Sequence, residues 1–167
     1  DNLEESLLIN NETVCGLSDD GLYFDNQHGI MANYPDYLEK IFSRADSLIA
    51  LHCEDENIIE KKLFQYKNKY GNKIPVDYHH LIRDEHACFT ATKRVVEIAE
   101  KHNTRLHILH VSTEKETTLF DSKIPVSKKR ITAEVCVHHL WFSDEDYKTQ
   151  GSLIKWNPSI KSERDKN

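Results

Sequence analysis

Short apolar runs alternate with longer amphipathic stretches along this chain of 167 residues. The run 47–53 is almost continuously apolar, as in a strand covered on both faces, and further strands are predicted at 13–17, 105–111 and 131–140. Helical spacing predicts helices at 35–45, 56–70, 84–101 and 112–120. Strands that alternate with helices form βαβ units, so we expect a parallel sheet with its strands in sequential order, either open or part of a barrel.

The overall composition excludes several classes of protein. Lys and Arg number 22 against 28 Asp and Glu, which gives a net charge of −6, whereas a polyanion-binding protein usually carries the opposite balance. No apolar run approaches the roughly 20 residues of a membrane-spanning helix, and the N-terminus does not resemble a signal peptide. The four cysteines are widely spaced and form no C-x-x-C pair, which predicts reduced, mostly buried thiols. We therefore expect a cytoplasmic protein that binds neither nucleic acid nor membrane.

Residues that bind metals or transfer protons follow each of the predicted strands. The strand ends carry Asp19 and Asp20, His52 with Glu54, His110, and the pair 138–139 (HH). In parallel α/β folds the carboxyl ends of the strands form one edge, and active sites assemble there. Imidazole and carboxylate together suit zinc or a similar divalent ion, so the pattern predicts a metal site at this edge.

Strand alternation predicts which of these side chains share a face. Cys53 is expected to point away from His52 into the core, while Glu54 lies on the same side as His52 and could accept a hydrogen bond from its imidazole. His107 and His110 are three apart, so we expect His110 to face the site and His107 to face the layer between strands and helices. By the same rule only one of two adjacent histidines, 138 and 139, faces inward. The histidines at 28, 79, 80, 86 and 102 are predicted to be surface or loop residues, and 128–130 (KKR) a solvated loop.

Several motifs together resemble one enzyme family. They are 18–21 (SDDG), 51–55 (LHCED), 79–87 (HHLIRDEHA), 110–113 (HVST), 132–140 (TAEVCVHHL) and 155–161 (KWNPSIK). In this order they resemble segments of dihydroorotases, members of the amidohydrolase superfamily, over about residues 14–161. The resemblance implies an α/β fold, a partial TIM-type (β/α)8 barrel of about four parallel βα units, corresponding to strands four to seven. Residues 1–167 would then form one incomplete metal-dependent hydrolase barrel domain, since a complete barrel needs about 250 residues.

The resemblance also implies roles for individual residues. His52 and His110 match metal ligands at the ends of the fifth and sixth barrel strands, and Asp20 matches a bridging, catalytic carboxylate where many relatives use a carboxylated lysine. Asn157 matches a residue that contacts the substrate. The implied cofactor is zinc, as one or two ions. The family's first-strand His-x-His pair and eighth-strand Asp are not in these 167 residues, so the chain is expected to be inactive alone.

The implied activity is the reversible hydrolysis of dihydroorotate to N-carbamoyl-aspartate in pyrimidine biosynthesis, and a homo-oligomer is one expected assembly. Two alternatives stay open. The parent protein could be a cyclic amidohydrolase of the hydantoinase or allantoinase type, or a catalytically inactive dihydroorotase-like scaffold subunit. An open-sheet nucleotide-binding protein is disfavoured, because the chain has no glycine-rich phosphate loop.

Overall fold

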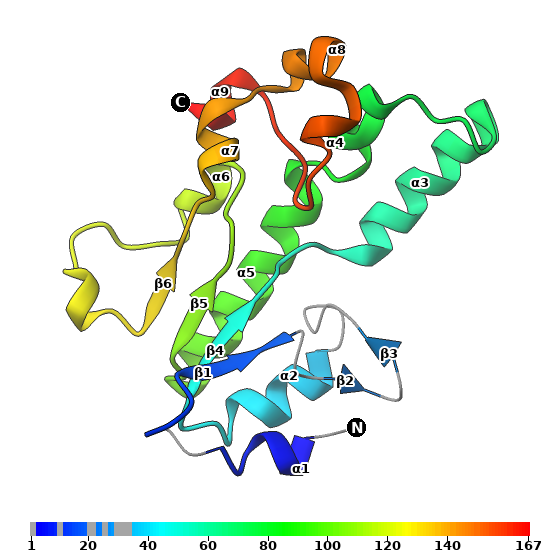
Figure 1. Ribbon diagram of the computed structural model, residues 1–167. Helices are drawn as coiled ribbons and strands as arrows, with labels where there is room; N and C mark the ends of the chain where they lie inside the picture. Colours follow the sequence, from blue (N-terminus) through cyan, green and yellow to red (C-terminus); the bar gives the residue numbers. More distant parts are fainter. Residues whose placement is uncertain (1–2, 10–11, 20–22, 25–26, 29–34) are drawn as a thin grey trace.

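The computed structural model describes residues 3–9, 12–19, 23–24, 27–28 and 35–167. One sheet contains the strands β1 (Gly16–Ser18), β4 (Leu48–Leu51), β5 (Leu106–Ile108) and β6 (Ile131–Ala133), in the order β1-β4-β5-β6 (Figure 1). Every neighbouring pair is parallel. The predicted sequential parallel sheet is therefore confirmed. The strands β2 (Tyr23–Phe24) and β3 (Gln27–His28) form a separate antiparallel pair.

Three long helices accompany this sheet, α2 (Pro35–Phe42), α3 (Glu56–Tyr70) and α5 (Glu85–His102). Six shorter α-helices are described: α1 (Leu3–Ser6), α4 (His79–Ile82), α6 (Glu114–Thr117), α7 (Val137–Trp141), α8 (Tyr147–Gln150) and α9 (Glu163–Lys166). Four 3-10 turns are bounded within the described residues, at Val76–Tyr78, Val126–Lys128, Asp144–Asp146 and Gly151–Ile154. None of the helices in the described part of the chain is long and apolar enough to cross a membrane.

The two longest helices begin at carboxylate caps. The Asp55 side chain accepts the Ile58 backbone N–H at the start of α3, and Asp84 accepts the Ala87 N–H at the start of α5. The Asp55 carboxylate also lies 2.7 Å from Nη2 of Arg94, which ties the start of α3 to α5. Because such caps are local signals, both helices start and stop within a residue of their predicted bounds.

The main core lies between the sheet and the helices α2 and α5. Ile49 and Leu51 of β4 and Leu106 and Ile108 of β5 have no solvent exposure, and they pack with apolar side chains of both helices. Burying each such aliphatic side chain stabilises the fold by roughly 1.5–3 kcal/mol. Alternate residues of the same strands, such as Ala50, face the other side of the sheet and are only half-buried.

The last predicted strand, 131–140, is wrong over most of its length. The strand β6 ends at Ala133, and the following residues continue into the short helix α7. The apolar residues that suggested a longer strand are partly solvent-exposed, Val135 at 45% and Val137 at 80%. Their alternation therefore does not mark a buried sheet face.

Candidate metal centre

His52 follows β4 directly and takes its direction from that strand. Ile49, Leu51 and Cys53 point into the helix layer, so His52 projects from the opposite face of the sheet. Its backbone N–H donates to Oδ2 of Asp19, a buried residue that follows β1, at 3.1 Å. The end of β4 is thus fixed to the end of its neighbouring strand.

His110 lies next to His52 because its backbone departs from the extended conformation of a strand. Its backbone has a φ of +40°, a value that non-glycine residues adopt rarely. Nε2 of His110 lies 3.0 Å from Nδ1 of His52, and the two rings meet edge to face with centroids 4.7 Å apart. The carboxyl ends of β4 and β5 therefore bring together the two histidines predicted as metal ligands, although their role as ligands stays a prediction.

A buried carboxylate holds the His52 ring. Nε2 of His52 lies 2.8 Å from Oε2 of Glu54, and Nη1 of Arg83 lies 2.5 Å from the same oxygen. The Glu54 side chain has no solvent exposure. The expectation that Glu54 accepts from His52 is confirmed. Arg83 is not among the predicted site residues, although it lies in the segment 79–87 (HHLIRDEHA).

The charges around Glu54 decide its protonation. Burial alone would raise its pKa, but the hydrogen bond from His52 and the Arg83 charge outweigh burial, and the pKa lies below its ordinary value. Glu54 is therefore ionised and can only accept hydrogen bonds. Nε2 of His52 must donate to it, which leaves the Nδ1 lone pair directed at His110.

The His110 imidazole is neutral at physiological pH. Burial, and then the nearby His52, lower its pKa to about 4. Among the described residues, neither Nδ1 of His110 nor Oε1 of Glu54 has a hydrogen-bond partner, although both atoms are buried. Neutral imidazole is the form that binds a metal ion.

This donor set fits a zinc-like ion. Two imidazole nitrogens on one tetrahedral zinc lie about 3.3 Å apart, given zinc–nitrogen bonds of about 2.0–2.1 Å. The observed separation of 3.0 Å is close to that value. A histidine ligand typically donates its second N–H to a carboxylate or a carbonyl, as His52 does to Glu54.

The two other predicted site residues are Asp20 and Asn157. Asp20, the predicted bridging carboxylate, lies outside the described residues. Asn157 is exposed, and its Oδ1 lies 3.1 Å from Nε2 of His79. Both line a cavity of about 420 Å³ together with Arg83 and Lys155. Arg83 thus contacts Glu54 and also borders the cavity at Asn157.

Three predictions about histidines are corrected by the structure. His107 does not face the helix layer, because its neighbours in β5 do. It contacts Thr132 Oγ1 at 2.8 Å on the other face. The positive φ at His110 breaks the alternation from which the opposite was predicted. His79 is buried in α4 rather than at the surface, and 138 and 139 lie in α7 rather than in a strand.

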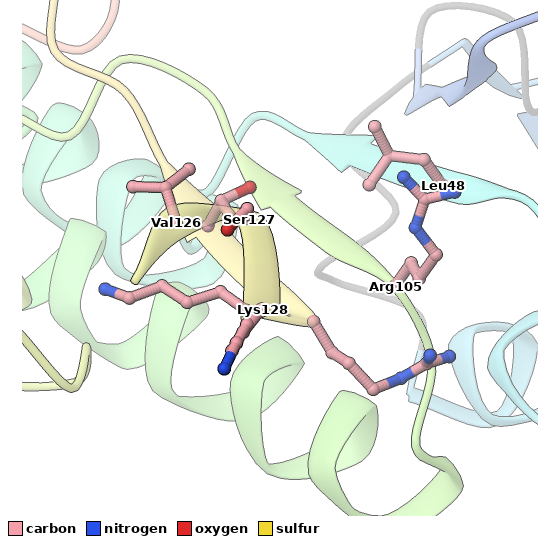
Figure 2. Close-up of a pocket in the computed structure, with 8 residues that line it drawn as sticks. Leu48, Arg105, Val126, Ser127 and Lys128 are labelled. Atoms are coloured by element: carbon pink, nitrogen blue, oxygen red, sulfur yellow. The ribbon is translucent and has the colours of Figure 1, made fainter. Parts of the chain in front are cut away.

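A second cavity lies at the opposite edge of the sheet. It has a volume of about 470 Å³ and is bordered by Leu48 and Arg105, at the amino ends of β4 and β5, and by the basic segment before β6 (Figure 2). In barrel enzymes the chemistry occurs at the carboxyl edge, so this cavity is not the candidate active site.

The chain is similar in sequence to several curated cyclic amidohydrolases. No protein-family model matches the chain. It is 28% identical to a dihydroorotase of Methanosphaera stadtmanae over 140 residues, which cover 84% of this chain and 30% of that protein. A dihydroorotase of Ehrlichia chaffeensis is 28% identical over 170 residues, covering 98% of this chain and 34% of that protein. An allantoinase of Bacillus velezensis is 30% identical over 127 residues, covering 76% and 27%.

The chain is similar in sequence to dihydroorotase-like amidohydrolases. This dihydroorotase-like chain spans about a third of the length of the curated relatives it matches. Its fold is also that of solved cyclic amidohydrolases. It superposes on a D-hydantoinase with a TM-score of 0.79 at 20% identity, covering 98% of this chain and 36% of that one. For a dihydropyrimidinase of Brevibacillus agri the TM-score is 0.80 at 19% identity, with 98% and 36% covered. The predicted partial barrel is therefore confirmed.

Proposed function

We propose that this chain supplies part of the active site of a zinc-dependent dihydroorotase, which interconverts dihydroorotate and N-carbamoyl-aspartate. The observation that carries the proposal is the His52–His110 pair at the carboxyl edge of the sheet, with the His52 ring held by the buried Glu54. The similarity to curated dihydroorotases supports the choice of reaction.

In this proposal each described residue has a definite task. His52 and His110 hold the metal, and Glu54, fixed by Arg83, keeps the His52 lone pair aimed at it. When bound, zinc lowers the pKa of a water molecule and polarises a carbonyl oxygen, which is the chemistry that amide hydrolysis requires. Asn157 orients the substrate from the edge of its cavity. Asp20 is proposed as a further metal ligand and catalytic carboxylate.

The cavity at Asn157 offers one reason to prefer dihydroorotate over an uncharged cyclic amide. Dihydroorotate carries a carboxylate, and the cavity is lined by the cationic side chains of Lys155 and Arg83. A hydantoinase or allantoinase activity is the second candidate, and it is favoured by the similarity to an allantoinase and by the fold of the hydantoinases.

A substrate panel tests the proposal on the full-length protein that contains this chain. We expect turnover of dihydroorotate and of N-carbamoyl-aspartate, loss of both after treatment with a chelator, and recovery with zinc. Preferred turnover of hydantoin, dihydrouracil or allantoin would instead establish the second candidate. No turnover of any of these substrates by the zinc-loaded protein would indicate an inactive scaffold subunit.

A further inference from the structure

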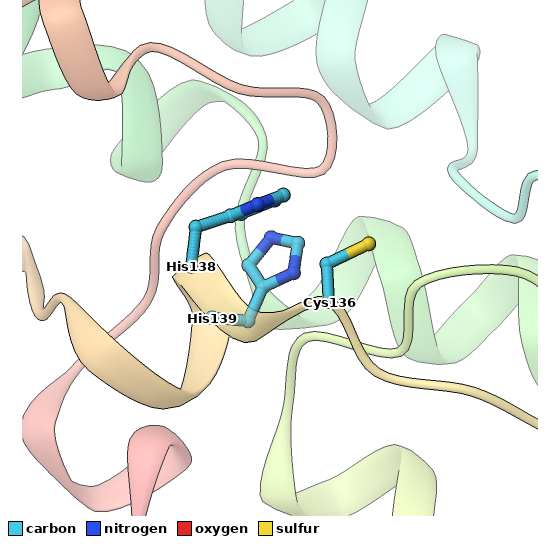
Figure 3. Close-up of side chains that lie close together, drawn as sticks. All are labelled: Cys136, His138 and His139. Carbon is cyan, nitrogen blue, oxygen red and sulfur yellow. The ribbon is translucent and has the colours of Figure 1, made fainter.

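Three potential metal ligands lie within four residues at the start of α7. Cys136 is the residue that caps this helix, and His138 and His139 occupy its first turn. One ligand atom from each of the three side chains lies within 4.8 Å of the other two. Figure 3 shows the His139 ring flanked by His138 and Cys136. The cluster shares no residue with the His52–His110 pair.

His139 is oriented as a metal ligand would be. Its Nε2 lies 3.1 Å from the carbonyl oxygen of Pro158, and since a carbonyl only accepts, Nε2 carries the hydrogen. The lone pair is then on Nδ1, which is buried and has no hydrogen-bond partner among the described residues. Ligating histidines commonly have this arrangement, in which a backbone carbonyl fixes the tautomer and leaves the other nitrogen for the metal.

The second imidazole is held by stacking. The His138 ring lies nearly parallel to the Trp156 indole, with centroids 4.5 Å apart and an interplanar angle of 14°. The His138 and His139 rings are 4.4 Å apart between centroids. Both rings therefore have supports outside the cluster, which reduces the entropy that a bound ion would have to overcome.

The donor types define the class of ion. One thiolate and two imidazoles form a set that favours zinc and similar borderline or soft ions over magnesium or calcium. Tetrahedral zinc would hold these atoms about 3.3–3.6 Å apart, given bonds of about 2.0–2.1 Å to nitrogen and 2.3 Å to sulfur. The observed limit of 4.8 Å thus requires the side chains to move inward by about 1 Å, which small rotations supply.

We propose that Cys136, His138 and His139 bind one divalent ion of the zinc class at a site separate from the His52–His110 pair. Three protein donors leave one tetrahedral position open for water or a small ligand. The proposal does not depend on the dihydroorotase activity.

Cobalt(II) distinguishes the two sites in the full chain. Cobalt bound by a thiolate gives a charge-transfer absorption in the near ultraviolet, which ligation by imidazole alone does not give. Cys53, the cysteine beside His52, points into the helix core, and burial raises its pKa well above the usual range, so it does not supply this signal. We expect one equivalent of cobalt to produce the absorption, and zinc to displace it.

Substitutions assign the signal to its ligands. We expect Cys136→Ala to abolish the absorption, and His138→Ala to weaken cobalt binding at this site at least tenfold. The matched control Cys15→Ala removes an exposed thiol elsewhere and should change nothing. The double variant His52→Ala/His110→Ala should retain the absorption. Circular dichroism confirms that each variant is folded, and the half-buried Cys136 should tolerate replacement.

Two outcomes would overturn the proposal. One is that saturating cobalt produces no thiolate absorption in the folded wild-type chain. The other is that the absorption survives Cys136→Ala, or disappears with Cys15→Ala, which would assign it to a different thiol.

Discussion

The Arg83 guanidinium lies 2.5 Å from the carboxylate of Glu54, although 29 positions separate the two residues. Glu54 has no solvent exposure, so its charge depends on this contact and on the hydrogen bond from His52. The segment before α5 is thereby connected to the candidate metal centre through a single buried carboxylate. This relationship is the basis of the first two predictions.

Arg83→Met should destabilise the fold. Removing one partner leaves the Glu54 charge buried without its counterion, and we expect the free energy of unfolding to fall by about 3 kcal/mol, the low end for a broken buried pair. Urea unfolding at pH 7 measures the change. Arg83→Lys keeps the charge and should be considerably milder. Equal losses in both variants would show that the hydrogen bonds of the guanidinium, rather than its charge alone, give the contact its strength.

The same pair predicts a pH dependence. The Glu54 pKa in the folded state is below its ordinary value of 4.5, so the ionised carboxylate stabilises the fold above pH 4.5. This contribution should be lost as the pH falls below 4.5 and through the folded-state pKa. In Glu54→Gln the corresponding acid-induced loss should be absent from unfolding curves measured at a series of pH values. If Glu54→Gln loses as much stability at acid pH as the wild-type protein, Glu54 is not the source of that loss.

Glu54→Gln should also weaken metal binding. Substituting the hydrogen-bond acceptor of a ligating histidine typically costs about 10–100-fold in metal affinity. Glu56→Gln is the matched control, because Glu56 also contacts Arg83, at 3.4 Å, whereas Glu54 is the carboxylate at 2.8 Å from the His52 ring. Zinc titration of each folded variant measures the affinity. A similar weakening in both variants would mean that Glu54 acts through Arg83 and not through His52.

His110 should titrate near pH 4 in the metal-free protein. Burial and the adjacent His52 lower its pKa from 6.5 to about 4, so the unfolded chain binds this proton more strongly. Between pH 6.5 and 4 the free energy of unfolding should therefore decrease as the pH falls. Nuclear magnetic resonance of the ring protons measures the pKa. His52→Ala should raise it, and a His110 pKa near 6.5 in the wild-type protein would contradict the buried geometry.

Asn157→Ala should separate substrate binding from metal binding. We expect zinc content to be unchanged and kcat/KM for dihydroorotate in the full-length protein to fall about tenfold, the effect of one lost hydrogen bond of about 1–1.5 kcal/mol. Ser152→Ala, which alters another residue lining the same cavity, is the control. Loss of zinc in Asn157→Ala would show that the cavity supports the metal ligands directly.

Local signals explain what could be predicted from this sequence. The predicted bounds of α3 and α5 agree closely with the structure because Gly71 and Asp84 act within one turn of the helix that each ends or begins. His52 could be placed opposite Cys53 because strand alternation needs only the neighbouring residues. The connection 72–83 contains no such signal, so the sequence does not predict that His79 of α4 is buried.

The remaining features depend on contacts between distant parts of the chain. Nothing near His110 indicates a positive φ, since that conformation usually belongs to glycine or asparagine. Arg83 reaches Glu54 because the chain returns after α3 and α4 to the segment that follows β4. Val135 and Val137 have the pattern of a strand but no sheet to cover them. Periodicity alone cannot distinguish such an exposed apolar segment from a buried strand.

The four residues that follow β4 make contacts with four different parts of the structure. His52 meets His110, Cys53 enters the core, Glu54 accepts from Arg83, and Asp55 caps α3. Deleting Cys53 would move the following residues back by one position, so the Glu54 carboxylate would enter the apolar layer and Asp55, the cap of α3, would take the place of the acceptor of His52. Natural variation in chain length is therefore expected to be excluded here, and to occur instead in the connections between the helices and the following strands.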